Sequence, residues 1–318
     1  MKSQSVTAPS LTKKRYTFFT DIRRNRFSYL LILPALLYVL VYSYLSYPYM
    51  IIAFKHFNYK LGVFGSEWCG FKNFEFFLKS TNAPTVIRNT LVLNILFIVT
   101  GTLTSLVLAI LLNELRSRVF VRTAQTMMLF PHYISWVVVS YILLAIFSNK
   151  NGLANQLLNA LGMKSVSWYT KADAWPTILV WMKIWKSAGM NAVIYLAAIT
   201  GIDESIYESA TIDGANRFQR IVSITVPLIM PTVCIMTLLA VGKIMNGDFG
   251  MIYALVGDQG ILYETTDVID TYVYRVLRQT GDPSQSMAIG LFQSLIGLVM
   301  VVGSNWIVKH TFHEGALF

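Results

Sequence analysis

Six long blocks of apolar residues run through this 318-residue chain, and each is long enough to cross a lipid bilayer. A membrane-spanning helix needs about 20 apolar residues, because each residue advances the helix by about 1.5 Å. The predicted spans are 27–54, 89–113, 123–147, 174–200, 221–245 and 286–308. Charged residues make up only 13% of the chain, whereas a soluble domain carries about 25%. We therefore predict an all-α integral membrane protein with six transmembrane helices.

The distribution of positive charge predicts the orientation of these spans. The net charge is +10, but the basic residues flank the apolar blocks and form no patch that would suit a nucleic acid. Residues 1–26 form a basic tail with several Lys and Arg side chains and a single acidic residue, Asp21. Such segments stay on the cytoplasmic side of a membrane. We expect this tail, a six-span domain over 27–318, and both termini in the cytoplasm.

The loops predicted on the outer side carry short helical patterns of their own. The stretch GFKNFEFFL, in the loop 55–88, is typical of a short amphipathic helix that lies on the membrane surface. The loop before the fourth span also contains a short helical piece. In the loop 247–285, apolar residues in ETTDVIDTYVYRVLR recur at helical spacing.

The sequence contains no motif that carries catalysis. It has no GxxxxGK[ST] phosphate loop, so ATP has no usual cradle in this chain, and it has no GxSxG or HExxH motif. His310 and His313 are interpreted as part of a solvated tail, because no cysteine or carboxylate cluster accompanies them. The acidic residues of 247–285 do not follow an EF-hand spacing and are interpreted as a solvated face. We expect no catalytic residue and no metal site.

Residues 201–222 interrupt the apolar pattern between the fourth and fifth predicted spans. Asp203 or Ser205 is suited to cap the start of a helix, because its side-chain oxygen can accept a backbone N–H. Gly214 permits a sharp turn or the close approach of a second backbone. A second helix is expected from Asn216 onward, leading into the fifth span. The segment is thus predicted to form a short helical hairpin at the membrane face, with Ile206 and Ile212 available to a partner.

This hairpin resembles the cytoplasmic loop through which ABC importer permeases contact their ATPases. The family motif reads Glu-Ala-Ala, three residues, Gly, nine residues, Ile, one residue, Leu-Pro. The matching positions here are Glu208, Ala210, Gly214, Ile224 and Pro227. Ser209 replaces the second Ala and Val226 replaces the Leu, and both are modest changes in size. Beyond the loop, IWKSAGMNAVIYLAAITGIDESIYESATIDGA and AIGLFQSLIGLVMVVGSNWIVKHTFHEG look like permeases of the carbohydrate-uptake branch, and the similarity covers nearly the whole chain.

The resemblance implies a type I ABC importer permease fold in a bacterial inner or plasma membrane. It implies a second, related permease as heterodimer partner, two ATPase subunits that bind ATP and Mg, and an extracellular or periplasmic solute-binding protein. The substrate it implies is a carbohydrate, with the oligosaccharide and alginate-type subgroup nearest. The residues it assigns to ATPase coupling are Glu208, Ser209, Ala210, Asp213, Gly214 and Ala215.

Three other classes of protein compete with this interpretation. A membrane-embedded enzyme that acts on a sugar lipid needs carboxylates near a membrane face, and Glu208 and Asp213 are the candidates. A secondary transporter uses carboxylates inside the membrane for ion coupling, and the six predicted spans contain none. An ABC permease for a solute other than a sugar would share all of these features. Dependence of uptake on an ATPase partner separates the importers from the first two classes.

Polar residues inside the spans are the candidates for the substrate path. Charges within a membrane are costly and usually face a cavity or the bundle interior. The candidate residues are Lys186, Asn191, Trp185, Lys243 and Asn246. Lys186 is the first choice because it lies deepest, either facing the cavity or bonding between helices. Lysine chains also reach out to the membrane surface and Trp often packs between helices, so packing is the preferred interpretation for Trp181 and Lys183. These residues suit both a neutral and an acidic sugar.

Overall fold

The computed structural model describes residues 22–149 and 151–311, most of them in helices. Most of the predicted basic tail, and His313, lie outside the described residues. The chain divides into two compact units, Met1–Ile51 and Ile52–Phe318. The first predicted span therefore falls mainly in the first unit, and the other five fall in the second, which carries all the sites discussed below.

The first unit contains α2 (Arg26–Tyr42), and η1, a 3₁₀-helix (Tyr44–Phe54), begins in it. Pro34 lies inside α2 and Pro48 inside η1. Proline removes a backbone donor but is tolerated in membrane helices.

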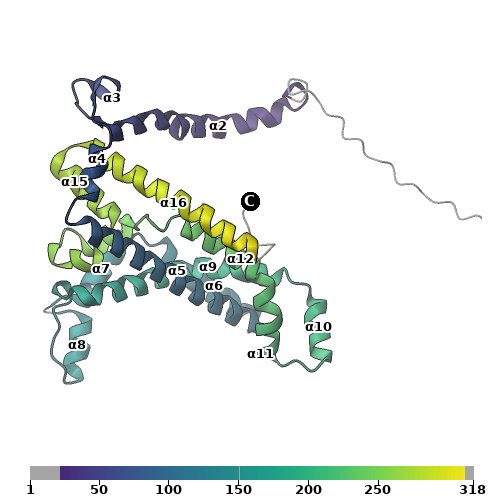
Figure 1. Ribbon diagram of the computed structural model, residues 1–318. Helices are drawn as coiled ribbons and strands as arrows, with labels where there is room; N and C mark the ends of the chain where they lie inside the picture. The colour runs from purple at the N-terminus through teal and green to yellow at the C-terminus, as the bar shows by residue number, and fades with distance from the viewer. Residues whose placement is uncertain (1–21, 150, 312–318) are drawn as a thin grey trace, which may run out of the picture. The chain divides into compact units, whose positions relative to one another are not determined.

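The second unit is a bundle of long helices with short elements at both ends (Figure 1). The long helices are α5 (Ala83–Glu114), α6 (Arg118–Tyr133), α7 (Trp136–Phe147), α9 (Trp175–Thr200), α12 (Val226–Val241) and α16 (Pro283–Thr311). At one end lie α10 (Glu204–Ile212), α11 (Arg217–Arg220) and the π-helix η4 (Ile221–Thr225). The other short elements are β1 (Lys55–His56), α3 (Gly62–Gly65), β2 (Glu67–Trp68), α4 (Lys72–Leu78), α8 (Leu153–Ala160), η2 (Trp168–Thr170), η3 (Ala172–Ala174), α13 (Phe249–Val256), η5 (Gly260–Leu262), α14 (Tyr263–Thr266) and α15 (Ile269–Thr280).

Two of the predicted spans differ from simple membrane helices. By length and apolarity, the described residues contain four helices able to cross a membrane, or five if α6 and α7 count as one span. The predicted span 123–147 is wrong as a continuous helix, because α6 and α7 are bent by 96° at Ile134 and Ser135. Ser135 is extended and its side chain accepts the N–H of Val138, so it starts a new helix.

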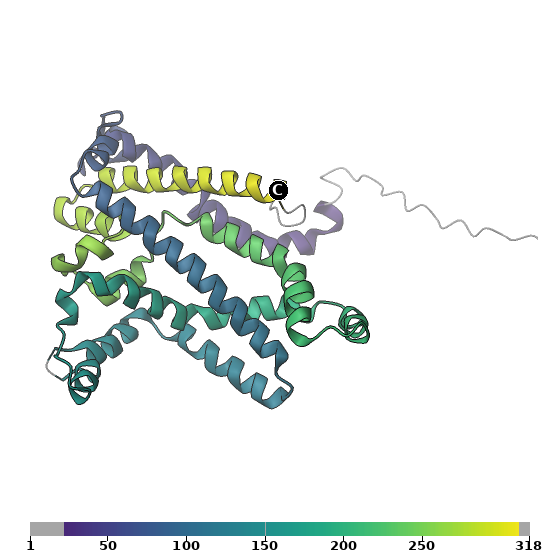
Figure 2. The same ribbon diagram turned by 60° about the horizontal axis from the view of Figure 1, so that its bottom comes forward.

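The other difference concerns the predicted span 174–200, which is present as the 26-residue helix α9 but is not among the strongly apolar ones. Lys183 and Lys186 dilute its apolar character. The helix packs along α5 and also against α6 and α12, so its neighbours shield it from lipid over much of its length. Figure 2 shows α5 running across the middle of the unit, with α9 behind it and α12 beside it.

The fifth predicted span, 221–245, ends four residues early. Helix α12 stops at Val241, and residues 242–248 form a turn that leads to α13. A Cβ at Gly242 would lie 2.6 Å from the side chain of Val301, and one at Gly297 would lie 2.9 Å from the carbonyl oxygen of Gly242. The backbones of α12 and α16 thus approach closely where the helix ends. Lys243 and Asn246 consequently lie in the turn and not on the span.

The elements at the outer end of the predicted topology pack as a small folded cap. The predicted helix in GFKNFEFFL is α4, but Phe77 is buried, with ring centroids 5.7 Å from Tyr272 and 5.8 Å from Phe292. One face of α4 therefore packs on α15 and α16, whereas Phe76 and Leu78 of the same helix are exposed. Asn89 of α5 donates to the carbonyl oxygens of Glu264 and Asp267, at 3.0 and 3.2 Å, and holds the loop 263–268 on α5.

Gly189 sets the crossing of α6 over α9. A Cβ at Gly189 would lie 2.1 Å from the backbone oxygen of Met128, far inside van der Waals contact. The Met128 oxygen is a backbone atom of α6 and the added Cβ is bonded directly to the backbone of α9, so the contact is relieved only by moving a helix.

We predict that Gly189→Ala lowers the thermal stability of the protein, because separating α6 from α9 costs about 2 kcal/mol, in the range of overpacked cores. Gly303→Ala is the matched control, since a Cβ there meets nothing within 4 Å. Melting temperatures of the purified variants in detergent test this. Equal melting temperatures for the two variants would show that the crossing is not tight.

Candidate functional site

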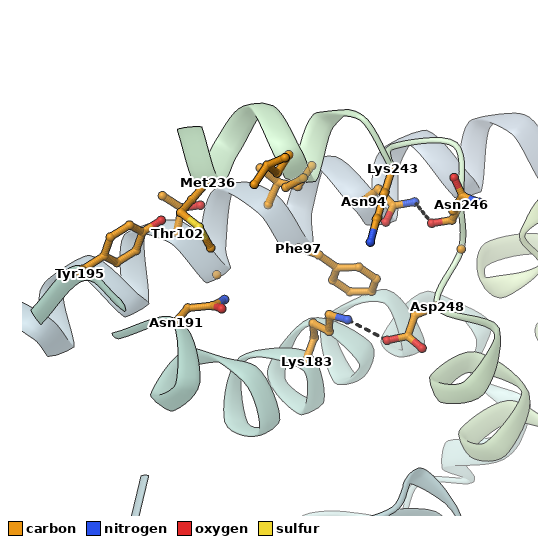
Figure 3. Close-up of a pocket in the computed structure, with 15 residues that line it drawn as sticks. Asn94, Phe97, Thr102, Lys183, Asn191, Tyr195, Met236, Lys243, Asn246 and Asp248 are labelled. Carbon is orange, nitrogen blue, oxygen red and sulfur yellow. Dashed lines mark hydrogen bonds and ion pairs between the residues drawn. The ribbon is translucent and has the colours of Figure 1, made fainter. Parts of the chain in front are cut away.

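A polar pocket lies between α5, α9 and α12 and is closed by the turn that follows α12 (Figure 3). Its volume is about 470 Å³, within the range of small-molecule sites. Apolar side chains, among them Phe97 and Met236, form part of the wall. The polar residues that line it are Asn94, Thr102, Lys183, Asn191, Tyr195, Lys243, Asn246 and Asp248. Such a concentration of polar groups is unusual between apolar helices and marks this pocket as the candidate substrate site.

Lys183 and Asp248 form an ion pair across the pocket, with 2.7 Å between Nζ and Oδ2 (Figure 3). The other carboxylate oxygen, Oδ1, accepts the backbone N–H of Met251 at 3.0 Å and so caps α13. Both oxygens of Asp248 are therefore engaged. The pair ties the middle of α9 to the start of α13.

Asn94 of α5 fixes the turn that carries the remaining polar residues. Its Nδ2 donates to the carbonyl oxygens of Ile244 and Asn246, at 2.9 and 3.1 Å. These carbonyls have no helical partner because α12 has ended. One amide group on a neighbouring helix thus replaces the missing backbone bonds and holds Lys243 and Asn246 at the rim of the pocket.

Lys243 gives the pocket a net positive charge. Its side chain is exposed, and within residues 22–149 and 151–311 it makes no hydrogen bond or ion pair. In Figure 3 its ammonium group points into the pocket, toward the side where Lys183 and Asp248 lie. Two lysines and one aspartate leave a net charge of +1 on the lining. An unpaired cation in such a site is suited to bind a carboxylate or sugar hydroxyls.

Asp270 of α15 supports the same turn from behind. Its Oδ2 accepts the backbone N–H of Gly247 and also, at 3.2 Å, the side-chain amide of Gln293, which reaches the carbonyl oxygen of Met245 at 3.0 Å. Burial raises the pKa of the Asp270 carboxyl above its ordinary value, although these hydrogen bonds act in the opposite direction. The turn is therefore bound to α5 on one side and to α15 and α16 on the other.

The structure brings together only some of the substrate-path residues predicted from the sequence. Asn191, Lys243 and Asn246 line the pocket, whereas Lys186 and Trp185 do not. Lys186 is buried and donates to the carbonyl oxygens of Pro131, His132 and Ile134, at the end of α6. It therefore bonds between helices, the second of the two roles considered for it. Trp185 is 42% exposed.

Other lining residues escaped the sequence reasoning. Lys183 was assigned to packing, but it lies in the pocket because Asp248, 65 residues further along the chain, attracts it. Asn94, Thr102 and Tyr195 were not predicted. The sequence signal that could have identified Asn94 is the one that identified Asn191, namely a polar residue within an apolar span. The hydroxyl of Tyr195 points toward Thr102 (Figure 3), a contact that no spacing within one helix reveals.

The predicted helical hairpin is present at the end of the bundle that lies opposite α15 (Figure 1). Asp203 caps α10 by accepting the N–H of Ser205 at 3.0 Å, and this bond lowers the pKa of the Asp203 carboxyl. Gly214 follows α10 with φ of +83°, a conformation that favours glycine. Asn216 and Gln219 form a reciprocal capping box at the start of α11.

The hairpin is cross-braced and presents an apolar surface. Arg220 donates to the hydroxyl of Thr211 at 2.8 Å, and the hydroxyls of Tyr207 and Thr225 lie 2.9 Å apart. The exposed fractions of the large apolar side chains are 41% for Ile206, 86% for Ile212 and 74% for Phe218. Of the predicted coupling residues, Glu208, Ser209, Asp213 and Gly214 are exposed, and Ala210 and Ala215 are half-buried. Exposed large apolar side chains on a rigid hairpin form a surface on which a partner protein can pack.

Comparison with known proteins identifies the class. Residues 101–312 match the family described as "Binding-protein-dependent transport system inner membrane component". The match covers more than half of the chain, and the chain belongs to this family. It is therefore a transport subunit of the inner membrane, and the family resemblance recognised in the sequence is confirmed.

Particular relatives cover nearly the full length. The chain is 36% identical to Protein LplB of Bacillus subtilis, over 97% of this chain and 96% of that protein. It is 32% identical to the polygalacturonan/rhamnogalacturonan transport system permease protein YteP of the same organism, over 99% of both. Among solved structures, a bacterial ABC transporter involved in the import of the acidic polysaccharide alginate is similar with a TM-score of 0.84 and 32% identity, over 92% of this chain and 99% of that chain. The similarity to its complex with an alginate pentasaccharide-bound periplasmic protein has the same TM-score.

We predict that Asp270→Asn flattens the pH dependence of stability. A carboxyl whose pKa is higher in the folded state than its ordinary value of 3.8 stabilises the protein when protonated, and this contribution is lost as the pH rises through the raised pKa. The asparagine oxygen still accepts from Gly247 and Gln293 but does not ionise. Melting temperatures measured from pH 4 to pH 8 should show the unmodified protein falling relative to the variant.

Asp270→Leu is the matched control, because it removes the acceptor together with the charge. Its melting temperature should lie below that of the asparagine variant at every pH. Parallel curves for the unmodified protein and Asp270→Asn would contradict the assignment of the titration to Asp270.

Proposed function

We propose that this chain is the permease subunit of an ATP-binding-cassette importer for oligosaccharides. One observation carries the proposal: a single compact unit combines a polar, positively charged pocket between its helices with an exposed apolar hairpin at one end. An importer subunit needs a pocket that binds the solute and a surface on which an ATPase docks. The relatives named above, one of which imports an acidic polysaccharide, support the same conclusion.

The partners follow from this role. The pathway lies between this chain and a second, related permease, and a solute-binding protein delivers the sugar from outside. Two ATPase subunits bind ATP and Mg and hydrolyse the ATP, because this sequence has no phosphate loop. The hairpin formed by α10 and α11 docks on an ATPase. Since the ATPases are cytoplasmic and an even number of predicted spans separates the hairpin from each end of the chain, we also propose that both termini, with the basic N-terminal tail, are cytoplasmic.

The mechanism uses the position of the hairpin between α9 and α12. Closure of the ATPases on ATP moves the hairpin, and α9 and α12 carry the motion to the pocket that they line. The pocket then opens toward the binding protein, and hydrolysis returns it toward the cytoplasm. Glu208 and Gly214 belong to the coupling surface and take no part in sugar binding.

The substrate proposed for the pocket is an acidic oligosaccharide. Lys243 supplies a free ammonium group, and Asn191 and Asn246 supply amides that bind hydroxyls or carboxylates. Lys183 stays paired with Asp248 in the absence of sugar. A neutral oligosaccharide is the second candidate, because the same groups bind hydroxyls without a charge partner.

We predict that Ile212→Lys greatly weakens copurification of the ATPases and abolishes transport-coupled ATP hydrolysis. The side chain is 86% exposed, so a charge there is harmless to the fold but costly in an apolar interface. Leu157→Lys is the matched control, because Leu157 is 67% exposed on α8, away from the hairpin. Copurification from membranes and hydrolysis stimulated by the loaded binding protein are the measurements. Full ATPase retention by Ile212→Lys would overturn both the docking surface and the orientation.

We predict that Lys243→Gln raises the KM for uptake of tetragalacturonate about tenfold, as expected for the loss of one charge-assisted hydrogen bond of about 1.4 kcal/mol. Uptake of an uncharged tetrasaccharide, where it occurs, should change much less. Lys164→Gln is the matched control, since Lys164 is exposed and lines no part of the pocket. The assay is uptake into proteoliposomes with all partner subunits. An unchanged KM for the acidic sugar would remove Lys243 from recognition.

A further inference from the structure

A second open depression lies between the end of α13, the turn that follows it, and α15. Its volume is about 500 Å³, and none of its lining residues belongs to the pocket described above. The residues that line it are Asp258, Gly260, Tyr263, Tyr274, Arg275, Arg278 and Gln279. In the proposed topology it lies on the outer side, because α13 and α15 are at the end of the unit opposite the α10 hairpin (Figure 1).

Aromatic rings in fixed positions form part of this depression. The ring of Tyr274 packs at 5.0 Å from both Phe249 and Tyr253, and those two rings are themselves stacked, with an angle of 10° between their planes. Tyr274, which lines the depression, is therefore held in place by two rings that lie outside the lining. The face of an aromatic ring is negative, so it attracts the C–H groups on the apolar face of a pyranose ring.

One guanidinium group forms a rigid part of the wall. Arg275 is bonded to the carboxylate of Asp267, whose side chain is 5% exposed, and it lies 4.1 Å from the ring centroid of Tyr263. Arg275 thus has a structural role, and its guanidinium group packs on the ring of Tyr263. Neither residue is available to exchange partners.

Arg278 is different, because its partner can be replaced. It bonds to Asp258 at 3.1 Å, but the side chains are 61% and 54% exposed. An ion pair so open to solvent contributes little to stability. A ligand carboxylate can take the place of Asp258, and Asp258 and Gln279 are then free to bind sugar hydroxyls. An acidic sugar can form hydrogen bonds with the charged and amide groups and can pack its apolar face on the aromatic rings beside them.

The position of the depression connects it to the first pocket. Helix α13 is capped at its start by Asp248, which lines the first pocket, and it ends at Val256, two residues before Asp258. Its eight residues span about 12 Å. The two sites therefore lie near opposite ends of one short helix, a separation that an oligosaccharide of a few sugar units spans.

We infer that the depression formed by Tyr274, Arg278 and Asp258 is an outer subsite for an acidic oligosaccharide, which holds part of the sugar chain before it enters the pocket of Lys243. The inference rests on the proposed function. It adds a second site and names the residues that recognise the ligand there.

The test uses two substitutions that spare the fold. Arg278→Gln removes the exchangeable cation, and its side chain is exposed. Gly260→Leu fills the depression, and a Cβ at Gly260 meets nothing within 4 Å. Lys164→Gln again controls for the loss of one positive charge. The complete complex with its partner permease and ATPases is placed in lipid nanodiscs without the binding protein, and tetragalacturonate binding is measured by calorimetry.

We expect each of the two substitutions to weaken binding at least fivefold, and the Lys164 variant to bind as the unmodified complex does. In a Lys243→Gln background the further loss caused by Arg278→Gln should persist, because the two sites are separate. Unchanged affinity in both Arg278→Gln and Gly260→Leu overturns the subsite. Unchanged sugar affinity in this assay, together with weaker docking when the binding protein is added back, also overturns it and assigns the surface to protein contact.

Failure of the proposed function has a different signature. If the unmodified complex with its binding protein takes up no saccharide, the importer assignment itself is wrong, whatever Arg278 does. If the unmodified complex imports the sugar and Arg278→Gln imports and binds it equally well, only the outer subsite is lost.

Discussion

The constraint on which this structure depends is that backbone groups freed by a helix break need partners, since a bilayer offers no water to replace them. The chain breaks its helices twice near the pocket, at the α6–α7 bend and at the end of α12. In both places a long polar side chain from a neighbouring helix binds the exposed carbonyls. Lys186 of α9 serves the first break and Asn94 of α5 serves the second.

These two contacts also explain where the pocket lies. After α12 ends, Asn94 binds carbonyls of the following turn and holds that turn beside α5. Lys243 and Asn246 are thereby placed at the rim, and Asp248 is placed within reach of Lys183. Gln293 and Asp270 hold the same turn from the other side. The hydrogen bonds that satisfy the carbonyl groups of this turn therefore also hold the polar side chains of the pocket in place.

The sequence predicted the parts of the fold that depend on local pattern. Most of the long apolar helices and the turn at Gly214 follow from spacing and residue type, and the structure contains them. Of the two caps predicted for α10, Asp203 and Ser205, the structure uses Asp203. The bend between α6 and α7 was missed. Pro131 was visible, but proline is often accommodated in a membrane helix, and the break depends on Lys186 from another helix to bind the freed carbonyls.

The pocket was predicted in part for the same reason. Asn191 and Lys243 were recognised because polar residues are rare inside apolar spans. The sequence favoured Lys186 over Lys183 as a substrate-path residue because Lys186 lies deeper in the span. In the structure the deeper lysine instead binds backbone carbonyls of a neighbouring helix. Which of the two lysines meets the pocket is decided by Asp248, far along the chain, and by the Pro131 and Ile134 carbonyls. Pairings of this kind depend on tertiary packing that one sequence does not display.

The same geometry links the two ends of the unit. Helix α9 carries Lys183 and Asn191 and runs directly into the hairpin, and α12 leaves the hairpin and ends beside Lys243. Before α12, the helix begins as the π-helix η4. There the hydroxyl of Thr225 lies 2.9 Å from that of Tyr207 and donates to the carbonyl oxygen of Arg220 at 3.4 Å. A π-helical turn is a common functional irregularity, because it loosens the regular bonding of the helix. The cross-braced hairpin is thus stiff and its junction with α12 is the deformable point. In the proposed mechanism, a displacement of the hairpin turns α12 relative to α9 and changes the separation of the pocket walls that carry Lys183 and Lys243.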